Sequence, residues 1–153
     1  MSLVLAEIFD MSYKPHVYFA CWNETRWIVV SSTFFLVPAW YSYINRLYWL
    51  SCVLTSTSVI SANYWKRANY SWERLLDRVF AKLCFIIFVV NGVVHLKGST
   101  DCILGYSGLV LLVYCYFMSC HSSNPNWWKY HMTFHFITAC SQILIIKNMS
   151  IER

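Results

Sequence analysis

The chain has 153 residues, of which 58% are hydrophobic, 19% aromatic and only 12% charged. A soluble domain carries about 25% charged residues, so this composition excludes an ordinary soluble enzyme and a disordered chain. The net charge of +5 does not indicate nucleic-acid binding, because the 12 basic residues are scattered between apolar runs. We therefore expect a membrane protein with no nucleic-acid partner, whose short loops carry its charge.

The hydrophobic runs predict an all-α, polytopic bundle of transmembrane helices. A helix needs about 20 mostly apolar residues to cross a bilayer. The expected spans are 27–44, 47–65, 75–96, 102–120 and 127–146. We expect an N-terminal interfacial segment over 1–26, the helical bundle over 27–146 and a C-terminal tail over 147–153. Most of the seven cysteines lie inside these runs without a CxxC pair, which argues against a disulfide framework.

The basic residues predict the orientation of a five-span bundle. Seven fall on the side of the N-terminus: Lys14, Arg26, Lys66, Arg67, Arg74, Arg78 and Lys129. Four fall on the other side: Arg46, Lys97, Lys147 and Arg153. The positive-inside rule then predicts a cytoplasmic N-terminus in a multi-pass protein of the endomembrane system (ER or Golgi) or the plasma membrane. The sequon at Asn148 would lie on the opposite side.

Two histidines inside the last span are the first candidates for chemistry, since ionisable residues within a membrane are costly and often functional. His131 and His135 are four residues apart and share one helix face. This spacing allows two imidazoles to bind one metal ion, but a catalytic zinc usually has three protein ligands. The alternative is a pair of interfacial histidines that bond to neighbouring helices.

Topology places further polar residues near this pair. The second span ends on the side where the third and fifth begin, so four residues are expected at similar depth: Ser61, Asp77, His131 and His135. His121, after the fourth span, lies on the same side, whereas His95 lies roughly 27 Å beyond Asp77 along a helix and belongs to the other. Asp77 also has a simpler interpretation, as a helix-start carboxylate or a partner of Arg74 or Lys82.

Together these residues resemble the CREST superfamily of membrane hydrolases, which includes alkaline ceramidases and the progestin and adiponectin receptors. The family pattern is Ser-x-x-x-His at the end of one span, Asp early in the next and His-x-x-x-His in the last. The matching segments here are 61–65, 76–81 and 131–135. The resemblance covers about residues 47–146 and rests on few positions.

The resemblance implies a zinc-dependent hydrolase that acts on the amide bond of a ceramide-like membrane lipid. His131 and His135 would hold zinc, Asp77 would act as a base or orient the water, and Ser61 would stabilise the oxyanion. The substrate would enter sideways from the bilayer.

Two departures from the family keep other interpretations open. Family members usually have seven spans rather than five, and Trp65 stands where the family has its first histidine. An indole is not a metal ligand. Either His121 supplies the third ligand, or the chain is a catalytically silent relative, or it is unrelated to the family. The competing class is a non-enzymatic accessory or packing subunit, within a homo- or hetero-oligomer in the membrane.

Overall fold

The computed structural model describes residues 14–18, 20–121 and 124–152. Its elements are β1 (Lys14–Tyr18), α2 (Trp22–Ser32), the 3-10 turn η1 (Thr33–Phe35), α3 (Leu36–Ile44), α4 (Tyr48–Trp65), β2 (Asn69–Tyr70), α5 (Trp72–His95), α6 (Ser99–Ser119) and α7 (Trp127–Ile151). The predicted all-α helical bundle is confirmed.

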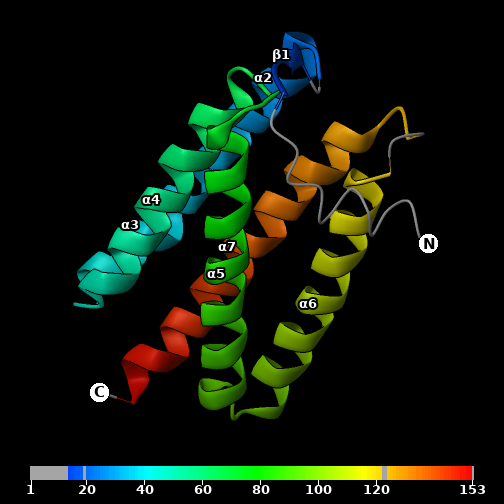
Figure 1. The fold of residues 1–153 in the computed structure, drawn as a ribbon. Helices are drawn as coiled ribbons and strands as arrows, with labels where there is room; N and C mark the ends of the chain where they lie inside the picture. Colours follow the sequence, from blue (N-terminus) through cyan, green and yellow to red (C-terminus); the bar gives the residue numbers. More distant parts are fainter. Residues whose placement is uncertain (1–13, 19, 122–123, 153) are drawn as a thin grey trace.

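The helices run up and down, with α7 at the centre of the arrangement (Figure 1). The segment formed by α2, η1 and α3 packs along α4, and α5 packs against α4 and α7. A short connection joins α5 to α6, and the two helices diverge from it towards the opposite end (Figure 1). α7 contacts α2, α3, α5 and α6 and thereby holds the bundle together.

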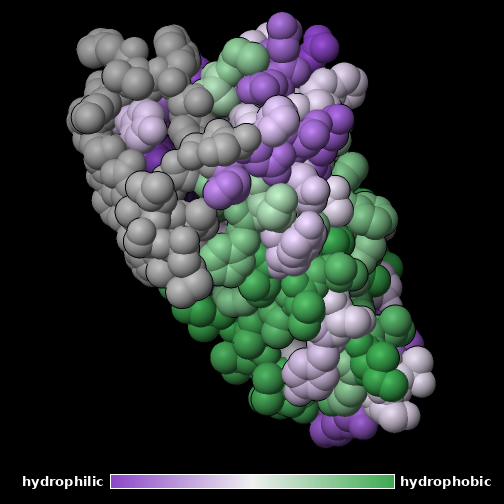
Figure 2. Space-filling model, turned by 90° about the vertical axis from the view of Figure 1, so that its right-hand side faces the viewer, coloured by the Kyte–Doolittle hydropathy of each residue, from purple (hydrophilic) through white to green (hydrophobic). Residues whose placement is uncertain are grey.

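Four segments among the described residues are long and apolar enough to cross a membrane: Trp22–Ile44, Trp72–His95, Ser99–Ser119 and Trp127–Ile151. The fifth expected span corresponds to α4, which lies alongside α2 and α3 but carries the buried polar residues Thr57, Ser58 and Ser61. On the face seen in Figure 2, a broad hydrophobic band separates hydrophilic groups at the two ends. This distribution is what a bilayer-spanning bundle requires.

The N-terminal part differs from the expected interfacial segment. Residues 1–13 lie outside the described part of the chain, and Lys14–Tyr18 form strand β1. β1 pairs antiparallel with β2, with Lys14 opposite Tyr70. Pro15 disfavours a helix here because proline lacks an amide N–H. The first helix of the described residues begins at Trp22 rather than Trp27, and Glu24 in its first turn is favoured by the helix dipole.

A tight turn joins α3 to α4 and makes them antiparallel neighbours. The N–H of Leu47 donates to the carbonyl of Ser42 over 2.9 Å, and that of Arg46 donates to Tyr43 over 3.0 Å. These two bonds form a Schellman motif, which needs a left-handed residue after the helix. Arg46 fills that position with φ 61°. Helix α4 can therefore return directly along α3.

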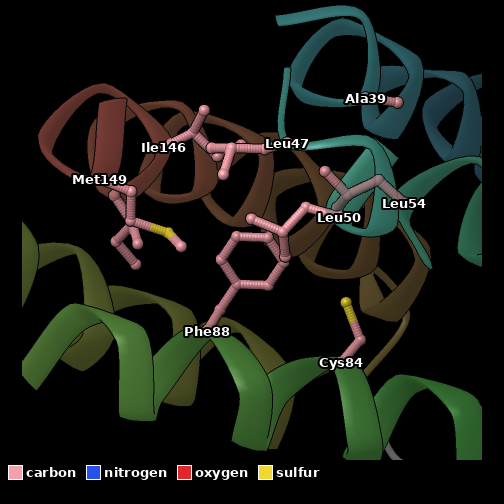
Figure 3. Close-up of a cluster of buried hydrophobic side chains, with 9 residues drawn as sticks. Ala39, Leu47, Leu50, Leu54, Cys84, Phe88, Ile146 and Met149 are labelled. Carbon is pink, nitrogen blue, oxygen red and sulfur yellow. The ribbon is translucent and has the colours of Figure 1, made fainter. Parts of the chain in front are cut away.

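Two hydrophobic clusters form the core. The larger contains Ala39, Leu47, Leu50, Leu54, Cys84, Phe88, Ile145, Ile146 and Met149 (Figure 3). The smaller contains Ile28, Tyr64, Trp65 and Ala68. Along α2–α3 and along α4, buried polar residues fall in sequence between members of the two clusters. On α7, His135 and Gln142 fall between Met132, which packs against the smaller cluster, and Ile145 of the larger one. The polar layer is therefore enclosed by apolar packing at both ends.

At the end of the bundle away from β1, one acidic residue links three segments. Glu152 accepts from Nδ1 of His95, at 2.5 Å, and pairs with Nζ of Lys97, also at 2.5 Å. These partners lower the pKa of Glu152, with the hydrogen bond from Lys97 as the largest cause. The cluster ties the end of α7 to the α5–α6 connection.

Candidate functional site

Two adjacent serines at the end of α2 begin the buried polar layer. Ser31 and Ser32 are both 0% exposed. Their hydroxyl oxygens lie 3.0 Å and 2.9 Å, respectively, from the carbonyl oxygen of Ile28, one turn earlier. Serines in apolar helices commonly bond to the preceding turn in this way. Each has a second neighbour from another helix.

The neighbour of Ser31 is His135. The Ser31 Oγ lies 2.8 Å from Nδ1 of His135, which is 3% exposed. The ring of Phe35 packs edge-on against the imidazole, with 5.0 Å between centroids. The hydrogen bond spans α2 and α7 and fixes the rotation of the imidazole ring.

The neighbour of Ser32 is Ser61 on α4. Their hydroxyl oxygens lie 3.2 Å apart, and Ser61 also bonds to the side chain of Asp77 on α5. Ser58 adds a further bond from α4, since its hydroxyl donates to the carbonyl of Ser32 over 2.9 Å. Residues from α2, α4 and α5 thus form one hydrogen-bonded group directly beside the Ser31–His135 pair. We call the residues of both parts, together with the neighbouring His131, the polar centre: Ser31, Ser32, Ser58, Ser61, Asp77, His131 and His135.

The hydroxyl protons in the polar centre can be assigned so that each is used once. An ionised carboxylate only accepts hydrogen bonds, so Ser61 donates to Asp77 when Asp77 is ionised. The oxygen of Ser61 is then an acceptor for Ser32. The carbonyl of Ile28 remains for the proton of Ser31. In this arrangement the oxygen of Ser31 accepts from Nδ1–H of His135.

His131 joins the polar centre through ring contacts. Its centroid lies 4.8 Å from that of His135, as expected for neighbours one turn apart on α7. The indole of Trp65 lies on it at an equal centroid separation of 4.8 Å. The four residues of the sequence pattern thus come together with Trp65 beside them.

The described residues bring two histidines together but no third metal ligand. Within the described ranges, no three His, Cys, Asp or Glu side chains form a group that could hold a metal ion. His121, the suggested third ligand, is exposed after the end of α6. Trp65 packs edge-to-face against His131, and its indole is not a metal ligand. We therefore derive no chemistry through zinc.

Two other polar residues noted in the sequence lie elsewhere. His95 bonds to Glu152 at the far end of the bundle, consistent with the predicted separation from Asp77. Lys82 is exposed on α5.

A mostly apolar cavity of about 120 Å³ lies beside the polar centre, between α5, α6 and α7. Phe35 and Phe134 line it, and both rings also contact the imidazole of His135. Gln142, also in the lining, is 2% exposed, and its Nε2 lies 3.7 Å from the Cys84 sulfur. Its Oε1 has no hydrogen-bond partner among the described residues.

Ser31 and Ser32 are not among the site residues predicted from the sequence. Their signal was a run of three hydroxyl residues, Ser31-Ser32-Thr33, inside an otherwise apolar span. Such a run is also compatible with simple helix packing, and only the structure connects it to His135 and Ser61.

No family model, curated protein or solved structure matches the chain.

Proposed function

We propose that the chain is a multi-pass membrane protein that binds a lipid amide, such as a ceramide-like lipid, as an altered relative of the ceramidase-type hydrolases. The polar head of the lipid would sit at the polar centre without zinc-dependent hydrolysis. The observation that carries this proposal is the hydrogen-bonded layer enclosed between two hydrophobic clusters. Polar groups at such a depth are costly and are usually kept for function.

The neighbouring cavity supports a lipid as the ligand. Its lining is mostly apolar, and Phe35 and Phe134 place it next to His135. A hydrocarbon segment fits such a lining, because apolar surface gains by leaving polar surroundings. A molecule with an amide or hydroxyl head and a hydrocarbon chain could use the polar centre and the cavity together.

A zinc-dependent lipid amide hydrolase is the second candidate. It is favoured by the adjacent imidazoles of His131 and His135. It requires a third ligand in addition to the groups that the described residues bring together. A water molecule or a partner protein would have to supply that ligand.

One set of measurements separates these candidates. Purified protein in phosphatidylcholine nanodiscs is tested for ceramide binding, for release of fatty acid and for zinc content by mass spectrometry. Our proposal expects saturable binding, no release and less than 0.1 zinc per chain (an order-of-magnitude limit for a site without three ligands). One zinc per chain, with hydrolysis that is lost in His131→Ala, would establish the hydrolase instead.

Absence of saturable lipid binding would favour a third class, a non-enzymatic accessory or packing subunit. In that case the buried serines would serve contacts between helices, as small polar residues often do in membranes. The Ser61→Ala variant provides the internal comparison, because it removes the bridge between Ser32 and Asp77. Our proposal expects weaker lipid binding in this variant, whereas a packing subunit would bind no lipid in either form.

We further propose that the N-terminus faces the cytoplasm, on the basis of the positive-inside rule. Cys21 is exposed just before α2 and provides a label at this end. In a variant that retains Cys21 as its single cysteine, a membrane-impermeant maleimide should react only after cells are permeabilised. Labelling of Cys21 in intact cells would show that the N-terminus faces the outside instead.

A further inference from the structure

Ser31 has two hydrogen-bonding neighbours but only one proton to donate. Its Oγ lies 3.0 Å from the carbonyl oxygen of Ile28 and 2.8 Å from Nδ1 of His135. A carbonyl can only accept a hydrogen bond, whereas a neutral imidazole carries one donor and one acceptor nitrogen. Both contacts are satisfied together when Ser31 donates to Ile28 and accepts from Nδ1–H of His135.

The hydrogen bonds of Ser32 and Ser61 favour the same direction for the bond between Ser31 and His135. Ser32 can donate to Ser61, whose own proton goes to Asp77 when that carboxyl is ionised. Ser32 then leaves the Ile28 carbonyl to Ser31. In a neutral imidazole, a proton on Nδ1 leaves a lone pair on Nε2.

We propose that Ser31 is a positioning residue that holds His135 as the Nδ1–H tautomer, so that Nε2 accepts a hydrogen bond from the amide N–H or hydroxyl of a bound lipid. The part of this inference that concerns the lipid rests on the function proposed above. The part that concerns the tautomer stands on the hydrogen bonds of Ser31 alone.

The surroundings of His135 explain why the site would favour a ligand that donates hydrogen bonds. Among the described residues, His135 is hydrogen-bonded at Nδ1, and the rings of Phe35, His131 and Phe134 pack against its imidazole. Gln142 supplies a second acceptor, Oε1, in the adjacent cavity. This Oε1 is buried without a hydrogen-bond partner among the described residues, and a buried acceptor left in this way is costly. Both groups therefore favour a ligand that donates.

Nitrogen-15 NMR of histidine-labelled protein in bicelles tests the tautomer directly, because the two ring nitrogens differ in shift according to which one is protonated. The protein is first treated with a chelator, so that adventitious metal does not determine the tautomer. A His135→Gln variant assigns the signals. We expect His135 to be protonated at Nδ1 in the wild type and to shift towards the Nε2–H form in Ser31→Ala.

Two further variants make the result specific to the hydroxyl of Ser31. Ser31→Thr keeps a hydroxyl and should retain the wild-type tautomer. Ser32→Ala removes an equally buried neighbour that does not bond to His135, and it should also leave the tautomer unchanged. A wild-type protein with Nε2–H on His135, or an unchanged tautomer in folded Ser31→Ala, would overturn the proposal.

Binding of two matched lipids tests the consequence for the ligand. A ceramide and its N-methyl, O-methyl analogue differ in the donors they offer and share the same chains. Wild-type protein should bind the ceramide at least about tenfold more tightly, the factor expected for one hydrogen bond of about 1.4 kcal/mol. Equal affinity for the two lipids would overturn the ligand part. Binding of neither lipid would refute the proposed function, whereas the tautomer measurement would still decide the role of Ser31.

Discussion

The indole of Trp65 lies against the imidazole of His131, with 4.8 Å between the ring centroids. His131 in turn lies 4.8 Å from His135. An aromatic ring that cannot ligate a metal therefore closes one side of a histidine pair that has the spacing of a metal site. This relationship is the feature of the site that favours the lipid-binding proposal over the zinc hydrolase.

Replacing Trp65 by histidine should create zinc binding that the wild type lacks. A third imidazole would then lie beside His131 and His135, which completes the usual number of protein ligands for zinc. We expect about one zinc per chain in purified Trp65→His, measured by mass spectrometry after dialysis.

The matched control for this variant is Trp65→Phe, which keeps a ring at the position without a ligand nitrogen. It should remain free of zinc, as should Trp65→His combined with His131→Ala. Stoichiometric zinc in the wild type, or none in a folded Trp65→His variant, would contradict our account of the site.

Removing the hydroxyl of Ser61 should destabilise the bundle. Ser61 is buried between Ser32 and Asp77, and its loss removes a hydrogen-bond partner from each of them. We expect Ser61→Ala to lower the free energy of unfolding by about 1–2 kcal/mol, measured by denaturant titration in mixed micelles. Ser107→Ala is the control, because the exposed Ser107 bonds only to its own helix, at Leu104. Equal effects of the two substitutions would show that the Ser61 bridge contributes nothing.

Close packing of α6 on α7 should make Gly108 sensitive to a single methyl group. A Cβ at Gly108 would lie 2.9 Å from the hydroxyl oxygen of Ser141. Gly108→Ala should therefore cost about 1 kcal/mol of stability through overpacking, seen as a lower unfolding temperature. The double variant with Ser141→Ala should recover most of that loss, and Gly98→Ala, which meets no atom within 4 Å, should be harmless. If Ser141→Ala does not restore the stability lost in Gly108→Ala, the loss does not come from a contact with the Ser141 hydroxyl.

The ionic cluster at the far end should give a pH-dependent contribution to stability. Because Lys97 and His95 lower the pKa of Glu152, the folded state favours the ionised carboxylate. Its contribution is fully present above the ordinary glutamate pKa of about 4.3 and disappears as the pH falls through the lowered value. Glu152→Gln should therefore lower the unfolding temperature at pH 7 but not at pH 2.

The partner of Glu152 provides the check. Lys97→Gln and Glu152→Gln should show a coupling at pH 7 in a double-mutant cycle, since the two side chains form an ion pair. That coupling should vanish at pH 2. A coupling that persists in acid would mean that packing rather than charge links the two residues.

The helices could be predicted from the sequence because hydrophobic runs of membrane length directly report spans. Segments 75–96 and 127–146 became α5 and α7 with added turns at their ends. Residues 14–18 could not be predicted as a strand, because β1 forms only by pairing with β2, which lies over 50 residues away in the sequence. Short strands depend on such partners rather than on local preference.

The candidate site was predictable in part. Helix spacing and the alternating direction of the spans predicted that Asp77, Ser61 and the two histidines lie at similar depth. This prediction counts α4 as one pass of the chain, although α4 is less apolar than the four membrane-length segments. The contacts of Ser31 and Ser32 were not predictable, because they depend on which face α2 presents to α4 and α7. A resemblance in sequence also could not reveal that Trp65 packs directly on His131.

Photocrosslinking with a ceramide that carries a diazirine in its acyl chain tests the central claim most directly, since the labelled residues report where the lipid lies. Our account predicts that peptides with cavity-lining residues such as Phe134 and Gln142 are labelled in wild-type protein in nanodiscs. Excess unlabelled ceramide should abolish this labelling, and Ser61→Ala should reduce it. Labelling confined to exposed residues of α5 and α6, such as Val93 and Val110, and insensitive to competitor, would contradict the account.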